Sequence, residues 1–294
     1  MNGPLQRRSA IVRNQAASGG ADDEPRINPA AQQRRGLCWR LRLAHLVTHK
    51  IAQLAKGPAI ARNIVFSQFD YWPTRRLRNE EIRNLPIYCV SMTSATRRRR
   101  IIERQVAEMS LEAFTFVEAI AGDNLDLVDL EQQGLYDDAA AKRFHERSLS
   151  LSEIACSLSH GRAYDIIVSR GHEVSMVIED DSLFVPSRMD RLDLSALPPG
   201  WDIAFLNSFI ENGRPRRRIS GSLYHGDAYT GSCAAYLVSK KGAQRIAEGY
   251  KPVIHAADGY VGRSDIMRLM YYPDCVLNGS VSHYYSNTVR YIRT

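Results

Sequence analysis

The stretch Val174 to Asp181 reads VSMVIEDD, a mostly apolar run of strand-forming residues that ends abruptly in three carboxylates. A short apolar run of this kind predicts a strand buried on both faces of a sheet with parallel strands. Adjacent carboxylates repel one another, so the triplet indicates a bound positive charge. Because alternate side chains of an extended chain share a face, we expect Glu179 and Asp181 to lie together and Asp180 to point away.

The end of this strand is also where a metal ion is expected. Ligands of α/β proteins bind at the carboxyl ends of the strands, and two hard oxygen ligands suit Mn²⁺ or Mg²⁺. Glu179 and Asp181 are therefore the candidate metal ligands. The alternative is an acidic surface turn in which Asp181 caps the segment that follows it.

Strands and helices alternate on both sides of this stretch. A capping box formed by Ser150 and Glu153 predicts a helix that ends at Gly171. Another helix is expected to bury Ile101, Ile102, Gln105, Val106 and Met109, with Thr93 or Ser94 capping its start. Further strands are predicted at 86–92, 114–120, 202–206 and 234–238, and a short helix at 240–248. This order predicts an α/β fold with a mostly parallel central sheet.

The first quarter of the chain differs from the rest in charge and composition. Residues 1–80 hold 14 Lys and Arg against 5 Asp and Glu, a net charge of +9, whereas the remainder holds 25 against 27, a net charge of −2. The near-neutral remainder argues against a nucleic-acid-binding protein, because such proteins concentrate positive charge on their folded core. We predict a disordered tail at 1–33, a basic amphipathic extension at 34–80 and the main α/β domain at 84–294.

Within the extension, residues 34–56 combine apolar residues at helical spacing with basic residues between them. This helix either packs on the main α/β domain or lies on an anionic membrane surface. The sequence contains no apolar stretch long enough to span a bilayer and no secretory signal. Its five cysteines are dispersed, without a Cys-x-x-Cys pair, and predict neither a disulfide framework nor a zinc site. We therefore expect a cytoplasmic protein, peripheral on the inner membrane at most.

Five ordered blocks of the sequence resemble glycosyltransferase family 25, which includes lipopolysaccharide and lipooligosaccharide galactosyltransferases and collagen-modifying members. The resemblance covers roughly residues 85–265, and the order and spacing of the blocks make it specific. The blocks are PIYCVSMTSATRRR at 86–99, EAIAG at 118–122, LSLSEIACSLSH at 149–160, VIEDD at 177–181 and TGSCAAYLVSKKGA at 230–243.

The resemblance implies a GT-A-like, Rossmann-type fold that binds a nucleotide sugar, UDP-galactose above all. It implies a metal-dependent, inverting transfer of a hexose to a glycan or glycolipid such as the lipopolysaccharide core. Glu179 and Asp181 match the metal motif, and Asp258 is the candidate catalytic base. The candidate donor-binding residues are Arg98, Arg99, Glu153, His160, Asp180 and Gly231.

Each of these assignments has a plainer alternative. Arg98 and Arg99 could be solvated arginines within a basic run, and His160 a structural partner on its helix. Asp258 precedes a glycine and could form a turn, with Asp165 and Asp227 as weaker rivals for the base. At the level of the whole protein, the alternatives are a different nucleotide-sugar donor, or a membrane-associated binding protein that has lost turnover.

Overall fold

The chain divides into two units, Met1–Ala52 and Gln53–Thr294. The computed structural model describes residues of the second unit only, namely 58–207, 215–226, 232–263 and 265–282. The predicted tail and the basic helix at 34–56 lie outside the described residues, as do Asp227 and Gly231. The prediction for the main α/β domain can therefore be compared with the structure, and the membrane-helix prediction cannot.

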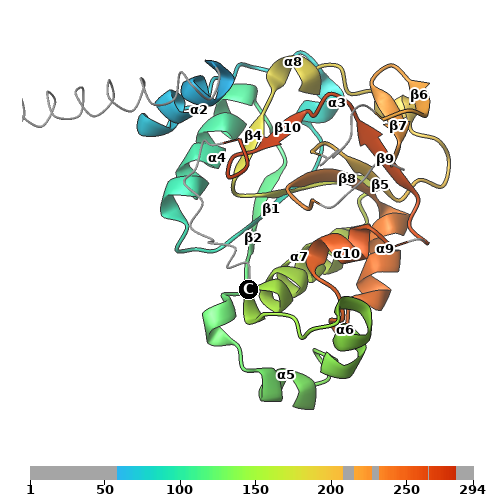
Figure 1. Ribbon diagram of the computed structural model, residues 1–294. Helices are drawn as coiled ribbons and strands as arrows, with labels where there is room; N and C mark the ends of the chain where they lie inside the picture. Colours follow the sequence, from blue (N-terminus) through green and yellow to red (C-terminus); the bar gives the residue numbers. More distant parts are fainter. Residues whose placement is uncertain (1–57, 208–214, 227–231, 264, 283–294) are drawn as a thin grey trace, which may run out of the picture. The chain divides into compact units, whose positions relative to one another are not determined.

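An eight-stranded sheet runs through the second unit in the order β2-β1-β3-β8-β5-β9-β7-β6 (Figure 1). A separate antiparallel pair is formed by β4 (Ser182–Phe184) and β10 (Val276–Asn278). The strands of the large sheet are β1 (Ile87–Ser91), β2 (Phe114–Glu118), β3 (Val174–Glu179), β5 (Ile203–Phe205), β6 (Arg218–Ser220), β7 (Leu223–His225), β8 (Ala235–Ser239) and β9 (Arg268–Tyr271). Every strand predicted from the sequence is present within two residues of its expected ends.

The large sheet is mixed, which corrects the prediction of a mostly parallel sheet. β1 pairs in parallel with β2 and with β3, and β5 pairs in parallel with β9. The other four pairings are antiparallel, because β8 inserts between β3 and β5 and a β6–β7 hairpin extends the far edge. Apolar runs in the sequence predicted β1, β2, β3, β5 and β8, but β6, β7 and β9 were not predicted.

Helices cover both faces of the sheet, as the alternation of strand residues requires. Along β1, Tyr88 and Val90 pack on one face, and Ile87 and Cys89 pack on the other. The first face is covered by α7 (Leu151–Arg170), α9 (Lys240–Gly249) and α10 (Ala257–Val261), and the second by α3 (Glu80–Arg83), α4 (Thr96–Met109) and α8 (Pro186–Met189). The α/β class predicted from the sequence is confirmed. The remaining described elements are α2 (Pro58–Gln68), η1 (Gly122–Asn124), α5 (Leu127–Gln132), α6 (Asp138–His145) and η2 (Leu194–Ala196).

The long helix α7 begins and ends where the sequence predicts. The Ser150 hydroxyl accepts from the backbone N–H of Glu153, whose carboxylate accepts in return from the backbone N–H of Ser150. Gly171 ends the helix with a φ of 69°, a left-handed conformation that favours glycine. Midway, a Cβ on Gly161 would lie 2.0 Å from the Tyr250 ring, so this glycine lets Tyr250 approach α7 closely.

Helix α4 buries the predicted face, but it starts differently from the prediction. Ala95 is its N-cap residue and provides no side-chain hydrogen bond, so capping by Thr93 or Ser94 is wrong. The Thr93 backbone N–H instead donates to the Glu118 carboxylate at the end of β2. This hydrogen bond ties the loop before α4 to the neighbouring strand end.

Part of the predicted extension packs on the sheet domain. Trp72 is buried, and its indole N–H donates to the carbonyl of Phe184 at 2.8 Å. Leu77 belongs to the core cluster beside α3 and α4, and Arg75 pairs with Asp190 at 2.7 Å. The packed core therefore reaches back at least to Trp72, ahead of the boundary predicted at residue 84. None of the helices in the described residues could cross a bilayer.

Candidate active site

The carboxyl ends of three parallel strands meet at one edge of the sheet. Val90 of β1 lies opposite Glu179 of β3, and Ser91 lies opposite Glu118 of β2. The antiparallel strand β8 begins at the same edge, where the Glu179 backbone N–H donates to the carbonyl of Ala234 at 2.9 Å. This edge therefore gathers the acidic triplet and the segment just after the predicted Gly231 loop.

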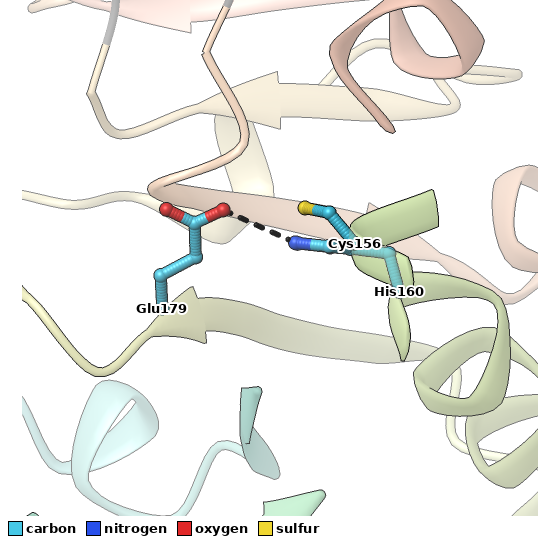
Figure 2. Close-up of side chains that lie close together, drawn as sticks. All are labelled: Cys156, His160 and Glu179. Carbon is cyan, nitrogen blue, oxygen red and sulfur yellow. Dashed lines mark hydrogen bonds and ion pairs between the residues drawn. The ribbon is translucent and has the colours of Figure 1, made fainter. Parts of the chain in front are cut away.

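Glu179 is the last residue of β3, and its side chain is 29% exposed. One carboxylate oxygen lies 3.3 Å from Nε2 of His160 (Figure 2). The Cys156 thiol, one turn earlier on α7, faces the same carboxylate. A strand and a helix that the sequence predicted separately thus place two of the predicted site residues, Glu179 and His160, in contact.

Asp181 is buried and lies close to Glu179. Its Oδ2 accepts from the Ser280 hydroxyl at 2.7 Å, and its Oδ1 lies 3.5 Å from Nδ2 of Asn278. Burial and the charge of Glu179 raise the pKa of Asp181 to about 6 against the lowering effect of Ser280. A cation between the two carboxylates would relieve this destabilisation of the charged form.

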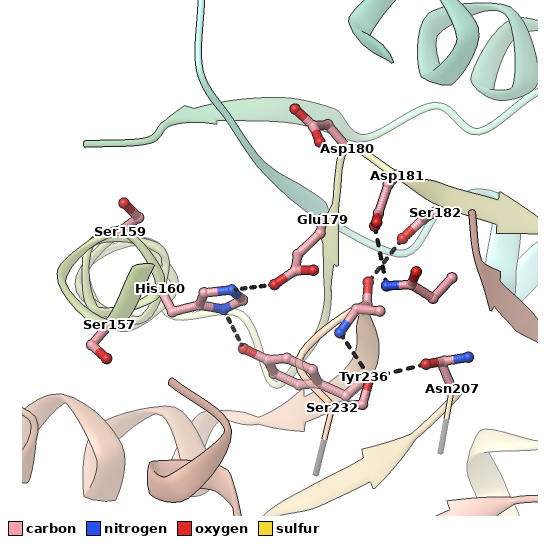
Figure 3. A network of polar contacts seen from close by, with 12 residues as sticks. Ser157, Ser159, His160, Glu179, Asp180, Asp181, Ser182, Asn207, Ser232 and Tyr236 are labelled. Atoms are coloured by element: carbon pink, nitrogen blue, oxygen red, sulfur yellow. Dashed lines mark hydrogen bonds and ion pairs between the residues drawn. The ribbon is translucent and has the colours of Figure 1, made fainter. Parts of the chain in front are cut away.

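Asp180 has a separate environment from its two neighbours. Its Oδ1 lies 3.1 Å from Nη1 of Arg98, and its Oδ2 accepts from the Ser91 hydroxyl at 2.9 Å. Figure 3 shows its carboxylate on the opposite side of the strand end from those of Glu179 and Asp181. The expected alternation of the three carboxylates is therefore present, and Asp180 anchors the start of α4 to β3.

Arg99 binds the ends of the first two strands. Its guanidinium donates to the carbonyl of Ser91 at 2.7 Å and to the Glu118 carboxylate at 2.8 Å, and it lies over the Phe116 ring, 4.5 Å from the ring centre. These contacts give Arg99 a structural task at the site edge. Contact with a donor phosphate stays a prediction for both Arg98 and Arg99.

His160 is fully buried and connects Glu179 to two tyrosines. Its Nδ1 lies 3.1 Å from the Tyr236 hydroxyl, which lies 2.5 Å from the Tyr164 hydroxyl. Burial by itself lowers the pKa of His160, but contacts with Cys156 and Glu179 outweigh it and raise the pKa to about 10. The ring is therefore held on both sides, and its Nε2 is aimed at Glu179.

Glu153 lies in the first turn of α7, and its carboxylate forms contacts with nearby residues. Besides the capping box, its carboxylate pairs with Arg147 at 2.6 Å. These interactions, that with Arg147 first, lower the pKa of Glu153 to about 2. The contacts explain Glu153 as a structural residue, and donor binding by it stays a prediction.

Asp258 lies in the first turn of α10, and its side chain is exposed. Among the described residues its carboxylate has no hydrogen bond or ion pair. Burial raises the pKa of the Cys233 thiol, and the charges of Glu179 and Asp258 raise it further, so both carboxylates act electrostatically on that thiol. The rival Asp165 instead accepts a hydrogen bond from the Tyr250 hydroxyl at 2.7 Å, away from this group.

The residues at the strand end fit a divalent metal ion. Glu179 and Asp181 offer carboxylate oxygens from neighbouring positions, which are the ligands that Mn²⁺ and Mg²⁺ prefer. Asp180 is neutralised by Arg98 and is less suited to that role. The fit supports the predicted pair of ligands.

Several residues of this site were missed by sequence reasoning. Ser280 and Asn278 form hydrogen bonds with Asp181. Tyr236 contacts His160 through its hydroxyl, and the Ser91 hydroxyl donates to Asp180. Tyr236 sits inside the apolar run of β8 and gives no polar signal in the sequence. Asn278 ends β10, and Ser280 lies in the turn that follows it, where polar residues are ordinary turn formers.

Comparison with known proteins identifies the family to which the chain belongs. Residues 84–261 match the family model described as glycosyltransferase family 25 (LPS biosynthesis protein). The chain belongs to glycosyltransferase family 25. The matched range contains the sheet edge with the acidic triplet, α7 and Asp258. The family predicted from the five sequence blocks is confirmed.

Individual relatives of this family are distant and longer. Procollagen galactosyltransferase 1-B of Xenopus laevis is 27% identical over 173 residues, which cover 54% of this chain and 27% of that protein. A glycosyltransferase 25 family member of Aedes aegypti is 26% identical over 170 residues, covering 55% and 28%. A probable inactive glycosyltransferase 25 family member 3 of Rattus norvegicus is 27% identical over 166 residues, covering 50% and 28%. The matches thus span less than a third of each of these relatives.

Proposed function

We propose that this protein transfers galactose from UDP-galactose to a hydroxyl of a glycan or glycolipid acceptor such as the lipopolysaccharide core. One observation carries the proposal: the family match covers the sheet edge where Glu179 and Asp181 lie together. The sugar is supported by the relatives named galactosyltransferases. The acceptor class is supported by the family description, which names lipopolysaccharide biosynthesis.

The proposed reaction is an inverting displacement at the anomeric carbon. A bond forms between that carbon and the acceptor oxygen, while the bond to the β-phosphate oxygen breaks and the nucleoside diphosphate leaves with the electron pair. The acceptor proton passes to Asp258, whose exposed carboxylate has the chemistry of a general base. The charges of both Asp258 and Glu179 act on the Cys233 thiol, which supports assigning the two carboxylates to one site.

Glu179 and Asp181 would hold Mn²⁺ or Mg²⁺, which neutralises the charge that develops on the leaving diphosphate. His160, fixed by Tyr236, orients the Glu179 carboxylate. Arg98 lies beside the triplet and its side chain is 34% exposed, which supports a role for it in binding a negatively charged donor. The other residues proposed to bind the donor are Arg99, Glu153, His160, Asp180 and Gly231.

We also propose a cytoplasmic protein that is peripheral on the inner membrane through residues 34–56, where a basic amphipathic helix would hold it beside a lipid-linked acceptor. A non-catalytic binding protein is the second candidate function. The relative from Rattus norvegicus named as probably inactive supports keeping it. The intact carboxylate pair favours the enzyme.

A donor panel distinguishes these functions. Purified full-length protein is mixed with UDP-galactose, UDP-glucose or UDP-N-acetylglucosamine, and release of UDP is measured with Mn²⁺, with Mg²⁺ and with EDTA. Delipidated lipopolysaccharide core and a procollagen peptide serve as acceptors. We expect the fastest release with UDP-galactose, Mn²⁺ and the lipopolysaccharide core. Binding of UDP-galactose without release under every condition would favour the binding protein.

A further inference from the structure

Beside the carboxylate pair lies a second set of groups with a different ligand chemistry. Cys156, His160 and Glu179 each offer one ligand atom, and these three atoms lie within 4.8 Å of one another. Cys156 and His160 are four residues apart on α7 and share one face of the helix. Glu179 approaches them from the end of β3 (Figure 2).

We propose that Cys156, His160 and Glu179 bind Zn²⁺. Thiolate sulfur, imidazole nitrogen and carboxylate oxygen are the three ligand types that zinc combines, whereas Mn²⁺ and Mg²⁺ favour all-oxygen sites. Zinc bonds of about 2.0–2.3 Å bring tetrahedral ligand atoms to about 3.3–3.7 Å from one another. The separation of 3.3 Å between His160 Nε2 and Glu179 Oε1 falls within this range, and the Cys156 sulfur lies within 4.8 Å of both atoms, so side-chain adjustments would complete the site.

The surroundings of His160 suit a metal ligand. A ligating histidine commonly donates its other ring N–H to a neighbouring group, which fixes the ring. Nδ1 of His160 lies 3.1 Å from the Tyr236 hydroxyl, and a hydroxyl both donates and accepts. With Nδ1–H donating to Tyr236 and Tyr236 donating to Tyr164, the Nδ1 side of the ring is satisfied, and a metal ion would displace the proton from Nε2, the nitrogen that faces Glu179.

No zinc site was expected from the sequence, because its five cysteines are dispersed and form no Cys-x-x-Cys pair. The ligand set instead joins one thiol to a histidine on the next turn and to a carboxylate 19 residues beyond that histidine. It also shares Glu179 with the proposed catalytic metal. Zinc at this site would withdraw Glu179 from Asp181 and inhibit Mn²⁺-dependent transfer. Only this inhibitory consequence rests on the proposed function.

Metal binding can be measured without any turnover. Metal-free full-length protein is titrated with Zn²⁺ by calorimetry, and with Co²⁺ while recording the thiolate-to-cobalt absorption band. We expect one zinc per chain with a thiolate band, and at least a tenfold weaker affinity with loss of the band in Cys156→Ser. Cys156→Ala is the second variant, and circular dichroism verifies that both are folded.

Two other thiols provide matched controls. Cys38→Ser tests the region that also contains His45 and His49, and Cys233→Ser tests a buried thiol on which the charge of Glu179 acts. Both variants should keep the zinc affinity and the band. The proposal is overturned if folded Cys156→Ser and Cys156→Ala bind zinc as tightly as the wild type, or if Cys38→Ser alone removes the band.

The inhibitory consequence has its own measurement. Zinc should reduce Mn²⁺-stimulated UDP release in the wild type, with a smaller reduction in Cys156→Ser. If the wild type binds zinc but releases no UDP under any condition, the proposed function fails and the zinc site stands. If it releases UDP but binds no zinc, the zinc site fails and the proposed function stands.

Discussion

Nη1 of Arg98 lies 3.1 Å from Oδ1 of Asp180, so the middle carboxylate of the acidic triplet is the one that an arginine neutralises. Asp180 is buried and receives a second hydrogen bond from Ser91. The ion pair joins the first turn of α4 to the end of β3. It leaves Glu179 and Asp181 as the carboxylates whose mutual repulsion a bound cation would relieve.

Removing the two partners of this pair should have unequal effects on stability. Arg98→Gln leaves the buried Asp180 carboxylate without this ion pair, while the hydrogen bond from Ser91 stays. It should lower the free energy of unfolding by about 1–3 kcal/mol. Asp180→Asn removes one ion pair from an arginine whose side chain is partly exposed, and should cost about 1 kcal/mol or less. Urea denaturation measures both changes. An Arg98→Gln/Asp180→Asn double variant should be more stable than Arg98→Gln alone, and additive losses would contradict the pairing.

Glu153 should act on stability in a pH-dependent way. Its folded pKa of about 2 lies below the unfolded value of about 4.3. The carboxylate therefore stabilises the fold above the unfolded pKa, and this contribution disappears as the pH falls toward 2. Glu153→Gln, which can keep the capping box but loses the Arg147 ion pair, should cost about 1 kcal/mol at pH 7.

Urea denaturation of the wild type and Glu153→Gln at pH 7, 5 and 3.5 measures this contribution. The difference between the two proteins should shrink at the lowest pH. A difference that stays constant over this range would show that the ion pair contributes nothing. A rise in the donor KM of Glu153→Gln without loss of stability would instead give Glu153 the donor-binding role.

The proposed base is tested by Asp258→Asn. A carboxylate that accepts a proton mainly in the transition state should, when neutralised, lower kcat by a factor of about 10²–10⁴ while leaving donor affinity nearly unchanged. Asp165→Asn is the matched control, since Asp165 is tied to Tyr250. Donor binding by calorimetry and turnover by UDP release are measured for both. Equal losses of turnover in the two variants would remove Asp258 from its assigned role.

The N-terminal region is expected to contain two functional parts. A chain starting at residue 58 keeps Trp72 and Leu77 in the core, and should turn over a soluble acceptor at close to the full rate while losing salt-sensitive binding to anionic vesicles. A chain starting at residue 84 loses both side chains. It should be insoluble or strongly destabilised, because deleting one buried tryptophan side chain already costs about 3–5 kcal/mol.

Vesicle co-sedimentation at low and high salt, with circular dichroism of each truncated chain, measures these outcomes. Undiminished vesicle binding by the chain that starts at residue 58 would exclude residues 34–56 as the membrane helix. A stable, active chain starting at residue 84 would show that the Trp72 contacts are dispensable.

The sequence predicted those parts of the fold whose signals are local. Long apolar runs and the capping box located β1, β3, β8 and α7 to within about a residue, because burial and capping follow from near neighbours in the chain. It failed on the direction of β8, because a strand's partner depends on contacts distant in sequence. It also could not show that Trp72, far from the acidic triplet in the chain, is buried against Phe184.

In the candidate site, the charged residues were predictable from the sequence, but the residues that form hydrogen bonds with them were not. Glu179, Asp181 and His160 stood out as chemistry-bearing types in recognisable blocks. Tyr236 was hidden within an apolar strand, and Ser280 came from a turn almost a hundred residues later. Cys156 looked like a core residue, and only the approach of β3 to α7 places it beside Glu179.

The most direct measurement of the central claim is Mn²⁺-stimulated release of UDP from UDP-galactose by the wild type and by Asp181→Asn. The substitution is nearly isosteric and keeps an oxygen that can accept from Ser280, so the variant should fold with an unchanged circular dichroism spectrum. The account predicts that it loses at least 99% of the Mn²⁺-stimulated rate, about 2.7 kcal/mol or more of transition-state stabilisation. A folded Asp181→Asn protein with nearly the wild-type rate and the same dependence on Mn²⁺ would contradict the account.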